Sequence, residues 1–317
     1  MKNNENIIKL RNLIYLGLSS HISKEVALFD LPYHTNIGDG LIWYGEEIFL
    51  KKIGSHCIYK TSYYTSKFPQ FSEDVTILFH GGGNLGNLYH EHVEFLKKIV
   101  RFYPNNKIVI FPQTVFYSDE KIMNEDFKFL QGHSNLIISV RDLRSYNLMK
   151  KYFHDKVLSI PDMAFCLYDE NIIEKSSKRN KTLLLIRKDG ELSMNSLNCL
   201  DNSDKKDCYT FDWPTFHHKI FDGCFFFKVI SKLASFGIPF CLSLLDWYAH
   251  RFFSRNLYRI GVKFLKPYSK IYTTRLHGCI LAILLGKEVY VIDNSYGKNS
   301  GFYDTWLKDF SNVHLIL

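Results

Sequence analysis

A chain of 317 residues is longer than most single domains, so two domains of roughly 150 residues each are the first expectation. Hydrophobic residues make up 46% of the chain and aromatic residues 16%, which excludes an intrinsically disordered protein. The net charge of +8 favours an anionic partner, but the basic residues are scattered in pairs, which disfavours specific nucleic-acid binding.

Cysteine spacing and hydropathy indicate the cellular compartment in which the protein works. The seven cysteines show no Cys-x-x-Cys spacing, so neither a zinc site nor a disulfide framework is expected, and a reducing compartment fits best. Residues 1–6 lack the apolar core of a signal peptide, and no window reaches the about 18 apolar residues of a membrane span. We expect a cytoplasmic protein. The aromatic and basic residues between Trp247 and Lys266 are candidates for peripheral contact with the inner face of the membrane.

In the first half of the chain, short apolar runs rich in β-branched residues alternate with longer amphipathic segments. That alternation is typical of βαβ units and parallel sheets. The pattern predicts strands at 26–30, 75–79, 107–111 and 136–140, and helices at 41–52, 91–102 and 143–153. Each strand runs into a polar or glycine-rich turn, and ligands of such sheets bind at the carboxyl ends of the strands.

A polar stretch at 169–181 is interpreted as the linker to a second series of the same kind. This series is predicted to contain strands at 182–187, 238–244, 270–273 and 289–292, and helices at 225–236, 278–285 and 302–310. We expect an α/β protein with two Rossmann-like domains facing each other across a cleft. The predicted domains are residues 1–172 and 181–317, and the last helix is a candidate to pack back on the N-terminal domain.

The segment from Thr273 to Gly278 lies between a predicted strand and a predicted helix, where free backbone N–H groups favour an anion. Arg275 can add bidentate contacts to a phosphate or carboxylate, at about 1.5 to 3 kcal/mol for a charged hydrogen bond. His277 is positioned for proton transfer. The alternative is that Arg275 pairs with a surface carboxylate and His277 caps the helix, and position alone does not decide between them.

Other strand ends carry turns that are weaker candidates. The glycine turn 80–84 lets a ligand approach the backbone and offers N–H donors to an anion or a sugar hydroxyl, although a plain tight turn is the alternative. Asp39 and Asp142 are each placed to cap a helix, which needs no function. Arg187 ends the first strand of the second series and would point into the cleft, unless it is a simple exposed turn residue.

Taken in order, these motifs resemble the polysaccharide pyruvyl transferase family, which makes ketals on sugars of bacterial exopolysaccharides, capsules and wall polymers. The resemblance covers about residues 30 to 295 and rests on Asn36-Ile37-Gly38-Asp39, Gly81-Gly82-Gly83-Asn84, Ser139-Val140-Arg141-Asp142 with Ser145, Pro161-Asp162, Leu185-Ile186-Arg187 and Arg275-Leu276-His277-Gly278.

The resemblance implies an architecture like that of GT-B glycosyltransferases, phosphoenolpyruvate as co-substrate, and no metal or other cofactor. It makes His277 the acid/base. Donor binding is assigned to Arg187, Arg275, Leu276 and Gly278, to which we add Lys298 from its place after the last predicted strand. The acceptor side is assigned to Asn36, Asp39, Gly82, Gly83, Asn84 and Arg141, to which we add Gln113.

The acceptor is a sugar whose carrier, a lipid or a nucleotide, the sequence leaves open. Residues 195–219 are interpreted as a loop insertion that shapes acceptor choice. Within it, His217 and His218 are too close together to hold a metal from one helix face. For Lys298 a solvated loop remains the alternative.

Two rival functions stay open at this point. A GT-B glycosyltransferase with a nucleotide-sugar donor would share the sheets and the anion site, but only Glu191 and Asp293 are candidates to hold its ribose. A carbohydrate-binding module would use exposed aromatic residues such as Trp213, Trp247 and Tyr248. It would not need Arg187, Arg275 and His277 together.

Overall fold

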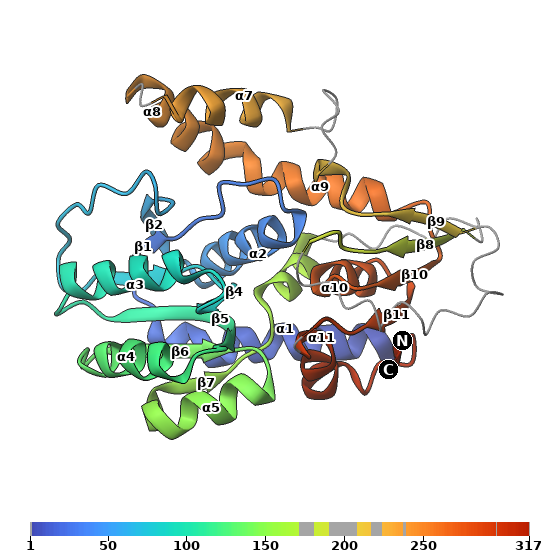
Figure 1. Ribbon diagram of the computed structural model, residues 1–317, viewed down its shortest axis with the longest axis horizontal. Helices are drawn as coiled ribbons and strands as arrows, with labels where there is room; N and C mark the ends of the chain where they lie inside the picture. The colour runs from blue at the N-terminus through green and yellow to red at the C-terminus, as the bar shows by residue number, and fades with distance from the viewer. Residues whose placement is uncertain are drawn as a thin grey trace. The chain divides into compact units, whose positions relative to one another are not determined.

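The computed structural model describes residues 2–170, 181–189, 208–216, 224–236, 239–295 and 297–316 (Figure 1). The chain forms two compact units. The N-terminal unit comprises Arg11–Tyr33 and Gly45–Cys166, and the C-terminal unit comprises Met1–Leu10, His34–Tyr44 and Leu167–Leu317. The expected linker lies mostly outside the described residues, and its first two residues end a 3-10 helix, η3 (Met163–Glu170).

The N-terminal unit holds a fully parallel seven-stranded sheet in the order β2-β1-β3-β5-β6-β7, with β4 paired to β5. Its strands are β1 (Glu25–Phe29), β2 (His56–Lys60), β3 (Thr76–Phe79), β4 (Gly82–Gly86), β5 (Ile108–Phe116), β6 (Leu136–Val140) and β7 (Val157–Ser159). The central strand β3 is buried along its whole length and β5 at every residue but the last, as expected for a sheet covered on both faces.

The helices of this unit follow the amphipathic pattern of the sequence. They are α3 (His90–Phe102), α4 (Glu120–Gln131), α5 (Leu143–Phe153) and the short helices η1 (Ser19–His21) and η2 (His154–Lys156). Helix α3 buries Phe95, Leu96 and Ile99 in the core and exposes its charged face. Asp142 accepts a hydrogen bond from the Ser145 N–H, so it caps α5.

Two helices contribute residues to both units. They are α1 (Lys2–Leu18), which the sequence pattern did not predict, and α2 (Ile37–Ile53), which begins four residues before its predicted start at Leu41. The first part of α2, up to Tyr44, belongs to the C-terminal unit. The motif at 36–39 therefore lies with the second sheet, although it precedes most of the first sheet in the sequence.

The C-terminal unit holds a parallel five-stranded sheet in the order β12-β11-β10-β8-β9. Its strands are β8 (Thr182–Leu185), β9 (Cys208–Phe211), β10 (Lys270–Thr273), β11 (Glu288–Ile292) and β12 (Val313–Ile316). Its helical segments are η5 (Pro214–Phe216), α7 (Phe225–Ala234), α8 (Pro239–Tyr248), η6 (Ala249–Phe253), α9 (Ser254–Leu265), α10 (Leu276–Leu284), α11 (Lys298–Phe302) and η7 (Tyr303–Leu307).

Several predicted elements of this half are corrected by the structure. The strand predicted at 238–244 is wrong, because Pro239–Tyr248 forms helix α8. A short apolar run does not distinguish a strand from a helix, and proline at the first helical position favours a helix start. The helix predicted at 302–310 is replaced by α11 and η7, followed by the unpredicted strand β12.

The chain ends lie close together within the C-terminal unit, where the segment after η7 contacts the start of α1. The Asn6 side-chain amide donates to the Asp309 carbonyl at 2.9 Å, and the Ser311 N–H donates to the Asn3 side chain at 3.1 Å. None of the helices in the described part of the chain combines the length and apolarity that a bilayer span needs.

Candidate functional site

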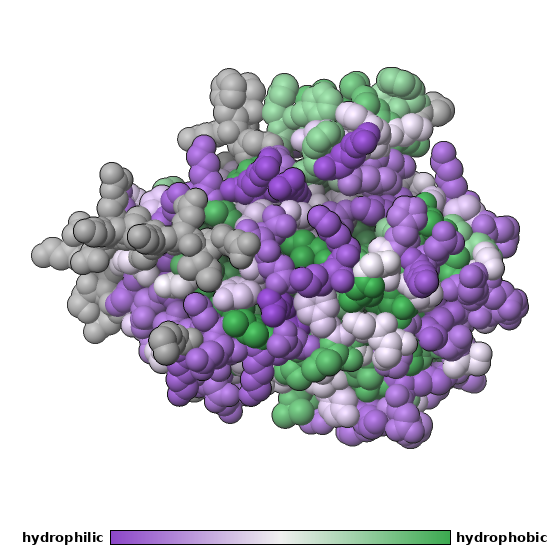
Figure 2. All heavy atoms as spheres, turned by 180° about the vertical axis from the view of Figure 1, so that it is seen from behind, coloured by the Kyte–Doolittle hydropathy of each residue, from purple (hydrophilic) through white to green (hydrophobic). Residues whose placement is uncertain are grey.

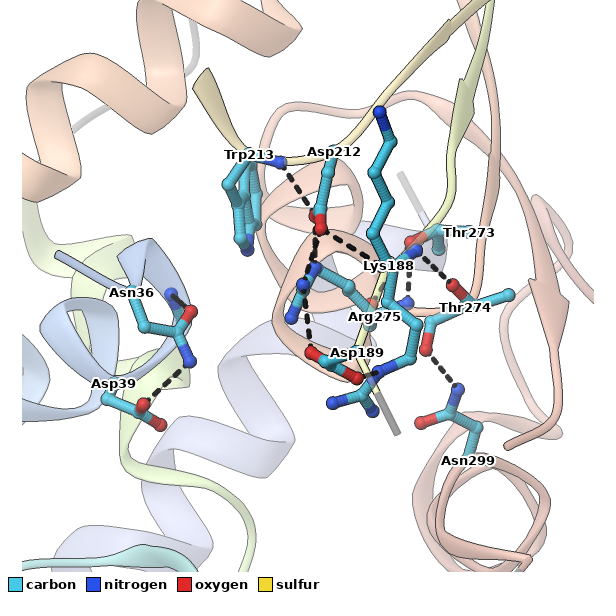
Figure 3. A network of polar contacts seen from close by, with 12 residues as sticks. Asn36, Asp39, Lys188, Asp189, Asp212, Trp213, Thr273, Thr274, Arg275 and Asn299 are labelled. Carbon is cyan, nitrogen blue, oxygen red and sulfur yellow. Dashed lines mark hydrogen bonds and ion pairs between the residues drawn. The ribbon is translucent and has the colours of Figure 1, made fainter. Parts of the chain in front are cut away.

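The C-terminal sheet reverses its strand order between β8 and β10, because β9 lies on one side of β8 and β10 on the other. Such a switch point opens a crevice at the carboxyl ends of the strands. Arg187 follows β8 there. Thr274 and Arg275 follow β10 (Figure 3). The two strand ends are joined by the Arg187 N–H, which donates to the Thr274 hydroxyl at 2.9 Å.

Arg275 is held by a buried carboxylate that the sequence analysis did not single out. Its Nε and Nη2 atoms donate to the two carboxylate oxygens of Asp212, the Nη2 bond measuring 2.7 Å. Asp212 also accepts from the backbone N–H groups of Lys188 at 3.2 Å and Trp213 at 2.7 Å. With the Phe216 ring 4.9 Å from its guanidinium carbon, Arg275 is fixed in one orientation.

A second carboxylate, Asp189, bridges the two arginines. It accepts from Arg187 Nε at 2.6 Å and from Arg275 Nη2 at 3.2 Å, and its side chain is 45% exposed. A pocket of about 450 Å³ opens here, lined by Lys188, Asp189, Asp212, Phe216 and Arg275. The site thus combines three cations with one buried and one solvent-accessible carboxylate.

Helix α10 begins at this pocket, with Arg275 as its N-cap and without a capping side chain. The Thr273 hydroxyl instead accepts from the Arg275 N–H at 3.0 Å. A methyl group on Gly278 would lie 2.5 Å from a Leu185 methyl and 2.8 Å from the Thr273 hydroxyl, so only glycine lets α10 pack this closely on the strands. Leu276 is buried at the first helical position, and the N-terminus of a helix such as α10 favours an anion.

His277 packs against the first turn of α2, within the same unit. A methyl group on Gly38 would lie 2.7 Å from His277 Nδ1, so the glycine is required for this contact. The turn is rigid, because Asn36 accepts from the Gly38 N–H at 3.0 Å and donates to Asp39 at 2.7 Å (Figure 3). Asn36 and Asp39, expected on the acceptor domain, therefore belong to the unit of His277.

Lys298 is the first residue of α11, and its N–H donates to the Asn294 side chain at 2.7 Å. The neighbouring Asn299 donates to the Thr274 carbonyl at 2.9 Å, which ties α11 to the end of β10. Asp293 accepts from three backbone N–H groups at this helix start, at 2.9 to 3.1 Å. That capping role weakens Asp293 as a ribose ligand, and the other candidate, Glu191, lies outside the described residues.

The glycine turn of the N-terminal unit lies at the switch point between β1 and β3. Gly82 has a φ of 137°, which a residue with a side chain rarely adopts. Glu46 accepts from the Gly81 N–H and contacts His80 Nδ1, both at 2.8 Å. Gly83 and Asn84 are partly exposed, so their backbone can meet a ligand.

Two residues expected to contact the acceptor are fully buried. Gln113 donates to the His80 carbonyl at 2.7 Å and accepts from the Asn84 N–H at 3.2 Å, so it holds the two ends of the glycine turn from its buried side. Arg141 donates to Thr114 at 3.0 Å and to Asp162 at 2.5 Å. Both side chains therefore act as internal supports of the strand ends in this structure.

A histidine and carboxylate pair at the end of β1 was missed by the sequence analysis. His92 Nδ1 lies 2.8 and 2.9 Å from the two oxygens of Asp30, a buried residue with a positive φ of 67°. Burial lowers the pKa of His92, but the hydrogen bond to Asp30 and the negative charge of Asp30 together raise the pKa by more than burial lowers it. The pKa of His92 is therefore above its usual value. The half-exposed rings of Tyr63 and Tyr64 lie beside this pair.

Other expectations concern the loop insertion and metal binding. Of residues 195–219, the described part includes β9 and η5, and Trp213 is fully buried rather than exposed; His217 and His218 lie outside the described residues. Among the described residues, one group has metal-like spacing, namely His90, Glu94 and Asp126. The ammonium of Lys97 already pairs with both carboxylates of that group.

Comparisons with known proteins identify the family of this chain. A family model for polysaccharide pyruvyl transferase matches residues 36–296. The chain is 32% identical over 310 residues to the putative pyruvyl transferase EpsO of Bacillus subtilis (strain 168), covering 95% of this chain and 91% of that protein. It is 27% identical over 301 residues to pyruvyl transferase 1 of Schizosaccharomyces pombe, covering 90% and 70% respectively.

A solved structure, that of the functionally uncharacterized protein KP1_0663 from Klebsiella pneumoniae, superposes with a TM-score of 0.65 at 24% identity. The match covers 97% of this chain and 98% of that one, and it bears on the fold alone. The family model spans most of the chain and includes both strand-end arginines and His277. The chain therefore belongs to the polysaccharide pyruvyl transferase family and is a transferase enzyme.

Proposed function

We propose that this enzyme transfers a pyruvyl group from phosphoenolpyruvate to a sugar of a bacterial surface polysaccharide, or of its lipid-linked precursor, and forms a pyruvate ketal. The observation that carries the proposal is the arrangement of Arg187 and Arg275, two buried arginines bridged by the solvent-accessible Asp189 at the start of α10. A donor with two anionic groups needs such a pair of cations.

Donor binding exchanges one carboxylate for another. Asp212 stays in place, because two backbone N–H groups and Arg275 hold it. Asp189 turns into solvent, and the donor takes its place between Arg187 and Arg275, with Lys188 lining the same pocket. The helix dipole at the start of α10 further favours the negative charge of the donor.

The reaction then needs proton transfers that His277 supplies. The methylene of the enol accepts a proton, and one acceptor hydroxyl adds to the carbon that carries the phosphate. A second hydroxyl then displaces phosphate from that carbon. Two carbon–oxygen bonds form and one breaks; one hydroxyl proton is balanced by the new methyl group and the other leaves with phosphate. An imidazole gives and takes such protons near neutral pH.

For the acceptor we propose the strand ends of the N-terminal unit. The partly exposed residues Gly83 and Asn84 would contact sugar hydroxyls, and the rings of Tyr63 and Tyr64 would offer an apolar face. The enzyme would work in the cytoplasm, where phosphoenolpyruvate is made. A nucleotide-sugar donor is less well supported, because Asp293 is engaged as a helix cap.

The proposal is tested by incubating the purified protein with phosphoenolpyruvate and a panel of sugar, nucleotide-sugar and lipid-linked acceptors. Phosphate release that depends on the acceptor is expected, together with a new ketal methyl signal by NMR. Turnover of a uridine or guanosine diphosphate sugar without phosphoenolpyruvate would instead identify a glycosyltransferase. Loss of acceptor-dependent release in Arg275→Met, but not in Arg11→Met on α1, would tie the activity to this pocket.

A further inference from the structure

Helices α7 and α8 carry the densest group of exposed apolar side chains in the described part of the chain. On α7 they recur every three or four residues and so share one face, and on α8 and η6 they continue with three more aromatic rings. The group, called the aromatic hairpin below, consists of Phe225, Phe226, Val229, Leu233, Phe236, Phe240, Trp247 and Phe252. Figure 2 shows apolar surface gathered over these helices at the top of the view.

The hairpin is anchored from its opposite face. Phe227, on the inner side of α7, stacks on Phe253 at a centroid distance of 3.7 Å. Phe253 in turn meets Trp43 of α2 at 6.5 Å, within the C-terminal unit. Helix α7 therefore has an exposed apolar face in addition to its packed one, although it also carries Lys228 and Lys232. A contiguous exposed apolar patch normally marks an interaction with protein or lipid.

A strongly basic surface adjoins the aromatic hairpin in the sequence. Residues 224–266 contain seven lysines and arginines and one acidic residue, a net charge of +6 out of +8 for the whole chain. The exposed positions of α9 and its C-cap residue form one stripe at helical spacing, and the stripe is entirely basic. It consists of Arg255, Arg259, Lys263 and Lys266.

We infer that the aromatic hairpin and the basic stripe form a docking surface for an anionic phospholipid membrane. The aromatic side chains insert into the membrane at the level of the lipid headgroups. Aromatic residues beside lysines and arginines are what interfacial binding requires. Charge decides between this partner and a second copy of the chain. Two copies meeting here would bring two basic stripes together, whereas anionic lipids neutralise them.

The apolar half of the inference is tested by flotation with vesicles, in the absence of any donor or acceptor, so the result does not depend on the proposed function. Wild-type protein is expected to bind vesicles of phosphatidylcholine mixed with phosphatidylglycerol. Phe236 and Phe240 are 70% and 74% exposed, so the double variant Phe236→Ser/Phe240→Ser should fold normally. It should lower the partition coefficient by about 30-fold. Leu16→Ser, at a 79% exposed position on α1, is the matched control and should bind like wild type.

The electrostatic half uses the variant Arg255→Glu/Arg259→Glu. With about fivefold in partitioning for each basic residue near an anionic surface, the double reversal should weaken binding by about 25-fold or more. Wild-type binding should also fall with added salt and be weaker on vesicles of phosphatidylcholine alone. The control Lys51→Glu/Lys52→Glu makes the same change of charge on exposed residues of α2 and should leave binding unchanged.

Three results would overturn the inference. One is a wild-type protein that does not float with the mixed vesicles. Another is equal loss of binding in the variants and in their matched controls. The third is a dimer in sedimentation velocity that Phe236→Ser/Phe240→Ser dissociates without any binding to vesicles, because that would identify the hairpin as an interface between copies.

Discussion

Arg141 and Arg275 each lie just beyond the carboxyl end of a parallel strand, one in each unit, and yet they differ in what they do. Each follows a parallel strand, β6 or β10, and each donates to an aspartate that is buried with it. Around Arg141 and Asp162 the protein is closed, and both side chains are at most 1% exposed. Around Arg275 a pocket opens, and the half-exposed Asp189 shares the guanidinium with Asp212.

The difference shows what distinguishes an arginine in a binding site from one that only supports the fold. The arginine in the binding site has a second carboxylate partner that is exposed to solvent. A sealed ion pair cannot exchange its partner, because either charge left alone in the interior costs several kcal/mol. An arginine oriented by one buried carboxylate and shared with an exposed one can release the latter to an external anion at little cost. Four predictions test this contrast, from the largest effect to the smallest.

The chemistry should depend on the open site alone. His277→Ala removes the proposed acid/base and should lower kcat by about 10²- to 10⁴-fold. Binding of phosphoenolpyruvate, measured by calorimetry, should stay near its wild-type strength. His314→Ala, at a half-exposed histidine paired with Glu288 in the same unit, is the control. A His277→Ala enzyme with nearly normal kcat would remove the histidine from the mechanism.

Substitution of Arg141 should mainly lower the stability of the protein, and substitution of Arg275 should mainly weaken donor binding. Arg141→Met leaves Asp162 buried without its charge partner and should cost about 3 to 5 kcal/mol in the free energy of unfolding. Arg275→Met should cost less stability, because Asp212 keeps two backbone donors. It should weaken donor binding by roughly 10- to 150-fold, the equivalent of about 1.5 to 3 kcal/mol. Urea denaturation and donor titration on both variants give the answer, and the contrast fails if the two variants behave alike.

The two carboxylates on Arg275 should act in opposite directions. Asp189→Asn removes the charge that competes with the donor, so the donor Kd should fall by about three- to tenfold. Asp212→Asn loosens the orientation of Arg275, so the donor Kd should rise by about tenfold. Both are isosteric changes and serve as each other's control. A rise of Kd in both variants would mean that Asp189 supports the donor site instead of occupying it.

The smallest effect concerns His92 and Asp30 in the N-terminal unit. The folded pKa of His92 is raised above 6.5, so the pair stabilises the fold fully below the unfolded pKa, and this stability is lost as pH rises through the folded value. We expect a small loss of stability, seen as a urea midpoint that falls as the pH rises above 6.5. Asp30→Asn tolerates the positive φ and should flatten this dependence. A variant that loses the same stability at every pH would point to packing instead.

Local patterns were sufficient for much of the fold. The strands at 136–140 and 270–273 and the helix at 143–153 have their predicted bounds, because apolar β-branched runs and capped amphipathic segments have few alternatives. The strand predicted at 238–244 is helix α8, since an apolar run next to α7 satisfies either structure until its packing partner is known. The unpredicted strand β12 is defined by its pairing with β11.

The candidate site, like the fold, was predicted in part from the sequence and depended in part on tertiary packing. The sequence alone placed Arg187, Arg275 and His277 at strand ends, because parallel strands present all their carboxyl ends at one edge of a sheet. It did not reveal that Asp212, 63 positions away, orients Arg275, or that the turn at 36–39 packs on His277. Nor did it show that Arg141 is sealed and Arg275 accessible. Those distinctions depend on which distant segments approach each arginine and on whether they exclude water, and only the tertiary structure decides both.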